Sequence, residues 1–515
     1  MNVLIFYPNL YGMNMLPPAI GYFTTLLKMD GHNVKLFDTT IYEALDGSID
    51  SDRQKADNLN ARAYDDSILK EYAKNSDNAS KDFNDLVSSF KPDLIAMSCT
   101  EDMFPLGVNL LRELKDKPKV VAGGVFPTFA PELALKLSYG TIDYILKGEG
   151  DRTLPEICRR LEKNIDLFDL DGLVMYGDKG IINNPLPSLI SMEEQVLPDY
   201  SLFEESRFYR PMQGKMRRML PVTTIRGCPY TCAYCNSPSQ IVIYKNENKK
   251  FLSNAKIKKV YDEIQHLIKH YNPDSFYFWA DTFLAWNNEE FDEFCDMYAE
   301  FKLPFWIQTR PETVTEYKFK RLKEVGLLRV AFGLEHGDEE FREKILDRKI
   351  SNEKILNKLR IVTDMGIPIS VNNIIGFPTE TRELVFDTIE LNRRIASDGI
   401  NAYSFTPFHG TPLREMAEEM GYFEKEKLVR CIVNPTMLNM PQFPKEEIEG
   451  IRRCFVLYVK MPKERWPEIK LAESLTPDGD EQYDYLKKEC LVKYMNYGDY
   501  DSNDDIGKVD FEKGK

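Results

Sequence analysis

The chain has 515 residues, 43% of them hydrophobic, so it is long enough to bury more than one core, and two or three domains are expected. Its 67 Lys plus Arg against 82 Asp plus Glu give a formal charge of -15, which argues against a nucleic-acid partner because it would repel a phosphate backbone. No apolar run reaches membrane-spanning length, and the first residues read as a buried strand rather than a leader peptide, which predicts a cytoplasmic protein.

The first part of the chain alternates short apolar runs with helix-like segments. Strands are predicted at 3–7, 33–37, 94–98, 119–122 and 142–146, with helices at 20–29 and 106–114. This alternation predicts a Rossmann-like, doubly wound parallel sheet, whose ligands gather at the carboxyl ends of the strands. The residues at those ends are Ser98, Thr100, Gly123, Gly124, Gly148 and Glu149. The polar segment 43–80 is expected to be a surface insertion that carries no chemistry.

A second series of strands and helices follows a connecting region. Its strands are predicted at 222–226, 275–279, 305–309, 329–333, 369–375 and 402–405. Six strands with helical spacers predict a partial (β/α)6 barrel of the TIM type, with its chemistry at the carboxyl ends of the strands. A helical C-terminal region and a loose polar tail over 495–515 should complete an α/β chain. The expected division is 1–165, 166–215, 216–410 and 411–515.

Three of the nine cysteines crowd into the segment RGCPYTCAYC at 226–235. The spacing C-x3-C-x2-C lets one loop hold three irons of a 4Fe-4S cluster and leaves the fourth iron without a protein ligand. An open iron of this kind can bind S-adenosylmethionine (SAM) and pass an electron to its sulfonium. We therefore expect Cys228, Cys232 and Cys235 to be the metal ligands.

A zinc loop is the main alternative for these cysteines. Structural zinc usually completes a tetrahedron with a fourth Cys or His nearby, and the next candidate, His266, is distant and lies on a predicted helix with His270.

The cysteine segment resembles the radical SAM superfamily, whose hallmark is C-x3-C-x-aromatic-C, with Tyr234 here as the aromatic residue. WADTF at 279–283, GLEHG at 333–337 and IGFPTET at 375–381 resemble barrel motifs of the same superfamily. The resemblance implies a set of residues around SAM, in which Asp281 and Glu335 could accept hydrogen bonds and Arg310 could pair with the carboxylate. That set is Tyr234, Asp281, Arg310, Gly333, Glu335 and Gly376.

The N-terminal part resembles the cobalamin (B12)-binding domain that precedes the barrel in one branch of this superfamily. LPPAIG at 16–21, VAGG at 121–124 and KGEG at 147–150 carry this resemblance. Together with the barrel motifs, the resemblance to the superfamily covers about residues 1–410. It implies that the residues at the sheet's strand ends contact cobalamin. The segment DGHNVK at 30–35 lacks the final glycine of the D-x-H-x-x-G motif that supplies a histidine to cobalt, so His32 is expected to be a surface turn residue.

The resemblance implies an enzyme that methylates an unactivated carbon of a small-molecule, lipid or peptide substrate, through a 5'-deoxyadenosyl radical and methylcobalamin. An electron donor such as flavodoxin or ferredoxin would be needed. The alternatives are a radical enzyme that catalyses cyclisation or rearrangement without methyl transfer, and a non-catalytic corrinoid-binding or redox-sensing iron-sulfur protein. A methylthiotransferase acting on transfer RNA would need a second cluster, yet Cys99 and Cys158 stand alone upstream.

Overall fold

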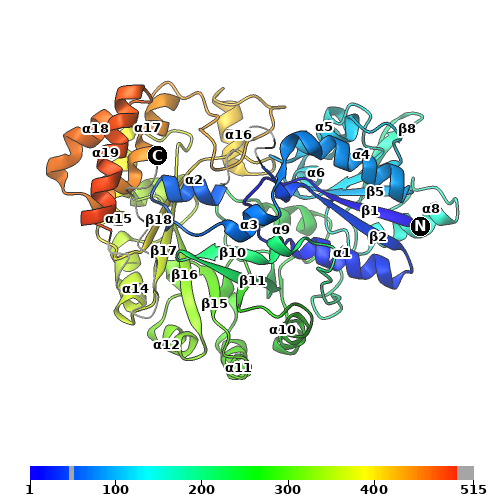
Figure 1. Cartoon of the computed structure of the whole chain (residues 1–515), viewed down its shortest axis with the longest axis horizontal. Coiled ribbons are helices and arrows are strands. Elements are labelled where there is room, and N and C mark those ends of the chain that lie inside the picture. The colour runs from blue at the N-terminus through cyan, green and yellow to red at the C-terminus, as the bar shows by residue number, and fades with distance from the viewer. Residues whose placement is uncertain (44, 46–50, 496–515) are drawn as a thin grey trace.

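The computed structural model of the chain describes residues 1–43, 45 and 51–495. The molecule has two large sheets, and a group of C-terminal helices packs beside the second one, at the end of the molecule away from the N-terminal sheet (Figure 1). In the described residues, no helix is both long and apolar enough to cross a membrane.

The N-terminal sheet has seven strands in the order β2-β1-β5-β6-β7-β8-β9. The first five strands in this order are parallel to one another, as predicted. The last two strands pair antiparallel, and the sequence patterns did not indicate them. The strands are β1 (Asn2–Tyr7), β2 (Asn33–Asp38), β5 (Leu94–Ser98), β6 (Lys119–Gly123), β7 (Tyr144–Leu146), β8 (Leu173–Gly177) and β9 (Gly180–Asn183).

Both faces of this sheet are covered, because successive residues of β1 enter two different cores. Val3 and Ile5 pack with α1 (Pro18–Met29) and α8 (Thr153–Glu162). Their neighbours Leu4 and Phe6 belong to a second core, and the helices on that side are α4 (Ala79–Phe90), α5 (Phe104–Arg112) and α7 (Pro131–Leu137). A strand buried on both sides reads as a continuous apolar run, which is why β1 was visible in the sequence.

The polar insertion lies largely at the surface, as expected for 43–80, and it also contacts the second unit. The Asp57 carbonyl at the end of α2 (Ser51–Asp57) accepts the Tyr483 hydroxyl at 3.3 Å, and α3 (Ser67–Glu71) packs near residues 205–208. Asn60 Nδ2 donates a hydrogen bond to the Ile400 carbonyl at 2.7 Å, and Leu59 is buried. The insertion therefore ties the N-terminal unit to the second one. Residues 44 and 46–50 lie outside the described residues.

The second sheet has the order β10-β11-β14-β15-β16-β17-β18, and its six strands from β11 onward are parallel. The sheet is an open half-barrel because β10 and β18 form its two edges. Its strands are β10 (Tyr209–Met212), β11 (Lys215–Thr223), β14 (Ser275–Trp279), β15 (Phe305–Thr309), β16 (Leu327–Glu335), β17 (Ile369–Ile375) and β18 (Gly399–Ser404).

Three of the predicted barrel strands have the predicted bounds, but the one predicted at 222–226 does not. The chain leaves the sheet after Thr223, and β12 (Ile225–Arg226) instead pairs antiparallel with β13 (Ser253–Asn254). This break turns the chain out of the barrel immediately before the cysteines.

Helices surround the half-barrel and continue into the C-terminal region, as predicted. Those after the barrel strands are α10 (Ile257–Tyr271), α11 (Asn288–Tyr298), α12 (Glu316–Glu324), α14 (Asn352–Asp364) and α15 (Arg382–Arg393). The C-terminal helices are α16 (Pro412–Glu419), α17 (Lys445–Lys460), α18 (Trp466–Ala472) and α19 (Pro477–Lys493). The predicted polar tail lies outside the described residues after Met495.

Gly124 is required by the turn that follows β6. Its φ is +131°, and a Cβ at this position would overlap the Cys99 carbonyl oxygen. We expect Gly124→Ala to destabilise the protein by roughly 3 kcal/mol, through backbone strain and displacement of the Cys99 backbone. Gly140→Ala is the matched control, because Gly140 also has a positive φ but nothing within 4 Å of its Cβ position. Thermal unfolding should show a clearly larger loss for Gly124→Ala, and equal losses would contradict the packing argument.

Candidate active site

The three clustered cysteines lie on one loop between β12 and α9 (Asn236–Asn246). The loop closes on itself through a hydrogen bond from Cys235 N to the Cys232 carbonyl at 3.1 Å. Cys228 Sγ lies 3.4 Å from Thr282 Oγ1, and Arg310 Nη1 donates to Cys232 Sγ at 3.1 Å. All three thiols are partly exposed and none forms a disulfide. The loop therefore presents three thiols from one short segment, two of them hydrogen-bonded by residues that follow β14 and β15.

The donor set fits an iron-sulfur cluster. In the described residues, no three His, Cys, Asp or Glu side chains are arranged to hold a single metal ion. In a cluster each thiolate binds its own iron, so the thiols surround the group rather than converge on one point. Burial raises the pKa of the Cys235 thiol to about 12, and bound metal would supply the positive charge that favours the thiolate. His266 lies on α10, where its Nε2 is 2.9 Å from the Pro198 carbonyl.

A buried network of arginines and glutamates lies behind the cysteine loop. Arg310, 9% exposed, stacks over the Tyr230 ring at 3.8 Å and forms a salt bridge with Glu312 at 2.5 Å. Arg348, 3% exposed, donates to Glu335 Oε1 at 3.1 Å. Burial raises the pKa of Glu335, although the charge of Arg348 opposes this shift. The network holds two cations and two anions, so it can be buried without a net charge.

Tyr234 connects this network to the open side of the loop. Its hydroxyl is 3.4 Å from Arg348 Nη1, and Arg348 Nη2 donates to the Gly333 carbonyl at 3.0 Å. A Cβ at Gly333 would overlap the Glu335 carboxylate, so this glycine makes room for the glutamate. Sequence reasoning missed Glu312 and Arg348. No strand-end motif marks Arg348, and the only signal for Glu312 is its position two residues after Arg310.

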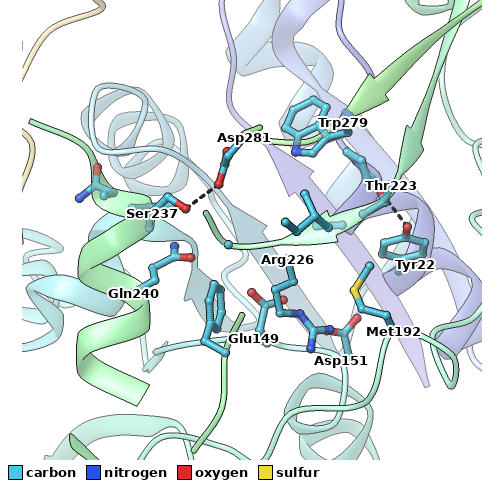
Figure 2. Close-up of a pocket in the computed structure, with 18 of the residues that line it drawn as sticks. Tyr22, Glu149, Asp151, Met192, Thr223, Arg226, Ser237, Gln240, Trp279 and Asp281 are labelled. Atoms are coloured by element: carbon cyan, nitrogen blue, oxygen red, sulfur yellow. Dashed lines mark hydrogen bonds between the residues drawn. The ribbon is translucent and has the colours of Figure 1, made fainter. Parts of the chain in front are cut away.

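The remaining two predicted SAM residues occupy different places. Asp281, which follows β14, accepts a hydrogen bond from Ser237 Oγ at 2.5 Å and faces the cavity shown in Figure 2. Gly376 donates its N–H to Glu380 Oε2 at 2.5 Å, and its Cβ position faces Ile448 of α17. The structure thus brings Tyr234, Cys235 and Asp281 to one cavity and leaves Gly376 among buried protein groups.

Two connected cavities lie between the carboxyl ends of the two sheets. The larger, about 570 Å³, reaches the cysteine loop, and the smaller, about 340 Å³, lies along the N-terminal sheet. All six residues predicted at the strand ends of that sheet line the smaller cavity: Ser98, Thr100, Gly123, Gly124, Gly148 and Glu149. Both cavities are lined by Pro17, Ala19, Phe23, Val125, Glu149, Gln240, Phe251 and Trp279. Trp279 was not predicted, although its position at the end of β14 is a signal that could have found it.

The glycines of this edge do more than leave space. A Cβ at Gly148, whose φ is +80°, would overlap the Tyr244 hydroxyl, and Tyr244 Oη accepts the Glu149 N–H at 2.9 Å. At Gly150 a Cβ would crowd the Phe23 ring at 2.9 Å. The glycines therefore also allow α9 of the second unit and α1 to pack on this loop.

His32 is not a surface turn residue, which corrects the sequence prediction. It is 5% exposed, and its Nδ1 lies 3.4 Å from the N-terminal amine. It lies just before β2, at the amino ends of the parallel strands. The cavities lie at the carboxyl ends of these strands, so His32 does not line them.

Comparisons with known proteins agree with this architecture. A model of the Radical SAM superfamily matches residues 222–391, and a model of the B12 binding domain matches residues 56–158. An uncharacterized methyltransferase of Pyrococcus horikoshii is 25% identical over 393 residues, which are 74% of this chain and 82% of the relative. The anaerobic magnesium-protoporphyrin IX monomethyl ester cyclase of Rubrivivax gelatinosus is 24% identical over 77% of this chain and 72% of its own length.

One solved structure covers nearly the whole fold. The radical SAM methyltransferase TsrM from Kitasatospora setae, with cobalamin and a 4Fe-4S cluster bound, aligns with a TM-score of 0.63 over 96% of this chain and all of that one, at 15% identity. At this identity the likeness establishes the arrangement of the two units and no more.

Residues 222–391, which hold the three-cysteine loop and most of the half-barrel, thus form a Radical SAM domain. A B12-binding domain, matched over residues 56–158, precedes it in the chain.

Glu149 should make the stability of the protein depend on pH. Burial, reinforced by the charge of Asp151 and opposed by Arg226, raises its pKa from 4.5 to about 7. The folded protein holds this proton more tightly than the unfolded chain, so the stability that it contributes is complete below about pH 4.5 and is lost as the pH rises through about 7. We expect Glu149→Gln to reduce the loss of stability between pH 5 and pH 8 by on the order of 2 kcal/mol.

Thermal unfolding at several pH values would measure this effect. Glu263, whose pKa burial also raises to about 7, stays in both proteins and contributes a common background. Asp171→Asn, an exposed carboxylate outside both cavities, is the control and should leave the pH profile unchanged. An unchanged profile in Glu149→Gln would show that Glu149 titrates normally.

Proposed function

We propose that this chain is a cobalamin-dependent radical SAM methyltransferase that acts on an unactivated carbon. One observation carries the proposal: the cavity at the cysteine loop and the cavity along the B12-type sheet share a wall, which includes Glu149 and Trp279. Methyl transfer to a substrate radical requires the two cofactors to face one space, and this geometry provides it. The similarity to methyltransferases supports the same reaction.

Several residues would hold the cofactors. Cys228, Cys232 and Cys235 would bind the cluster, and the network of Arg310, Arg348 and Glu335 would surround SAM. The residues at the strand ends of the N-terminal sheet would contact the corrinoid. When bound, these groups supply a radical that can remove hydrogen from an unreactive carbon and a methyl group that can replace it.

The protein's own groups would orient and enclose this chemistry. The hydrogen bond from Arg310 to Cys232 fixes one thiol and places a positive charge beside it, and such bonds tune cluster potentials. Tyr234 is held from behind by Arg348, so its ring can form a fixed wall for a flat group such as adenine. Trp279 lines both cavities, so its ring would face the space between the cofactors.

A second candidate is a radical cyclisation or rearrangement without methyl transfer. It is favoured by the similarity to the magnesium-protoporphyrin ester cyclase over most of both chains. The two candidates share every site described above and differ in whether SAM is also consumed as a methyl donor.

The domain boundaries at 165, 215 and 410 belong to this proposal, as do an electron donor of the flavodoxin or ferredoxin type and a cytoplasmic location. All nine cysteines are unpaired, which suits a reducing compartment.

Cys232→Ala should abolish cluster binding. The remaining two thiols cannot hold three irons, so after anaerobic reconstitution we expect loss of the iron-sulfur absorbance and of 5'-deoxyadenosine formation. Bound cobalamin should remain, because its cavity lies along the other sheet. Cys490→Ala, a buried thiol in α19, is the matched control and should keep all three signals. Simultaneous loss of cobalamin from Cys232→Ala would contradict the separation of the two sites.

The products distinguish the two candidate functions. A methyltransferase uses SAM in two ways, so the reconstituted protein with reductant and cobalamin should form S-adenosylhomocysteine as well as 5'-deoxyadenosine. Mass spectrometry of the quenched reaction measures both products. Omission of cobalamin should remove S-adenosylhomocysteine and leave 5'-deoxyadenosine. Formation of 5'-deoxyadenosine alone, at saturating cobalamin, would favour cyclisation or rearrangement.

A further inference from the structure

Part of the larger cavity belongs to neither cofactor region. Asp151, Met192, Gln195, Arg226 and Tyr22 line the larger cavity but not the smaller one, and we call these five residues the connector wall. They come from the loop after β7, the connecting region, the segment before the cysteines and α1. Figure 2 shows Met192, Asp151 and Tyr22 on the side of the cavity away from the Ser237 and Asp281 pair. A substrate between the cofactors would touch this wall.

Two buried residues of the connector wall, Asp151 and Gln195, could accept more hydrogen bonds than they do. Gln195 Nε2 donates to Asp151 Oδ1 at 2.9 Å, and this bond fixes the orientation of the amide because a carboxylate can only accept. Gln195 Oε1 then has no hydrogen-bond partner, although the residue is only 7% exposed. Asp151 is 8% exposed, and Gln195 Nε2 is its one side-chain partner among the described residues. A buried acceptor without a donor is costly, so this pair favours a ligand that brings hydrogen-bond donors.

The charged groups around the wall also favour a ligand that donates hydrogen bonds. Asp151 is buried and Glu149, beside the wall, is half-buried, and Arg226 is the cation close enough to influence Glu149. Arg226 forms no salt bridge in the described residues, and its Nη1 donates to the Ile190 carbonyl at 2.8 Å. Above about pH 7, where Glu149 is also ionised, these three groups carry one net negative charge. One added cation would neutralise it, and the attraction between opposite charges offsets part of the cost of desolvating them.

The rest of the wall is apolar or amphipathic. Met192, a flexible thioether, is 6% exposed and packs in the core that the two units share. Tyr22 is 7% exposed and donates its hydroxyl to Thr223 Oγ1 at 2.9 Å, so its ring is held in place with its polar end satisfied. These side chains would accept an apolar body next to the polar group.

We propose that the connector wall binds a protonated amine of the substrate, with Asp151 and Gln195 Oε1 as the acceptors and an apolar group packed on Met192 and Tyr22. The inference rests on the proposed function, because it takes the cavity between the cofactors as the substrate site. It narrows the substrate to a class of amines with an apolar or aromatic body.

Three probes with one ring and different head groups test this preference. The reconstituted full chain, loaded with SAM and hydroxocobalamin, is dialysed to equilibrium against 2-phenylethylamine, 2-phenylethanol or 3-phenylpropionate. We expect the amine to bind about tenfold more tightly than the alcohol, and the carboxylate to bind weakest, because charge-assisted hydrogen bonds are stronger than neutral ones and like charges repel. An amine that binds no better than the alcohol overturns the inference.

Asp151→Asn should remove most of the preference for the amine over the alcohol and leave the binding of the alcohol unchanged. Asp171→Asn, with the same chemical change at an exposed site, should keep the full preference. A preference retained in Asp151→Asn would also overturn the inference, and the comparison of probes on the unmodified chain decides the question if this variant does not fold. Formation of 5'-deoxyadenosine by the same preparations, after a low-potential reductant is added, tests the proposed function separately, since it needs only the cluster, SAM and an electron.

Discussion

The facing arrangement of the two sheets depends on one buried carboxylate. Glu101, 3% exposed, follows the end of β5 and accepts hydrogen bonds entirely from the other unit. His409 donates its backbone N–H at 2.9 Å and contacts the same carboxylate through Nδ1 at 2.7 Å, while Arg414 and the Val429 N–H donate at 3.3 and 3.2 Å. A charge buried this deeply is tolerated only with such partners, so separating the sheets would leave it unpaired.

This contact extends to the cysteine loop. Asn236, the first residue of α9, donates its side-chain amide to the His409 carbonyl at 2.7 Å. The path from the B12-type sheet therefore runs through Glu101, His409 and Asn236 to Cys235 in a short series of hydrogen bonds. The same residues that hold the two units together also fix the start of α9, and with it the last cysteine of the loop. Reactions that need two cofactors at a set separation require this kind of rigid connection.

The sequence predicted the framework well because its signals are local. Short segments rich in aromatic and β-branched residues lie between helix-like segments, so β14, β15 and β17 could be bounded to the residue. The cysteine spacing and the glycines at the strand ends are also local patterns. The antiparallel strands β8 and β9 were missed because β9 is almost wholly exposed and gives no pattern of buried residues.

The groups that sequence reasoning missed act through contacts between distant segments. Arg348 meets Glu335 and Tyr234 only because α13 (Glu339–Lys344) returns the chain to the loop, and nothing in its own neighbourhood marks it. The pairing of Gln195 with Asp151 spans 44 residues. His32 was misjudged because a turn residue looks exposed in sequence, while the N-terminal amine and Glu162 cover it in the fold. Such contacts are properties of the tertiary structure.

The cofactor sites and the connector wall are built from different parts of the chain, and this difference allows the fold to serve different substrates. The cysteine loop and the strand ends come from the two sheets, whose geometry is fixed by backbone pairing and buried charge. The connector wall takes Met192 and Gln195 from an irregular segment without a helix or strand of its own. Substitutions there change neither sheet nor the path through Glu101, so selection can alter the polarity of the wall at little cost to the cofactor sites. In this chain that wall carries an acceptor without a donor, Gln195 Oε1, beside the Asp151 carboxylate, whereas the charges of the network behind Tyr234 are balanced. The unpaired acceptor lines the larger cavity, where a donor group of a substrate can satisfy it.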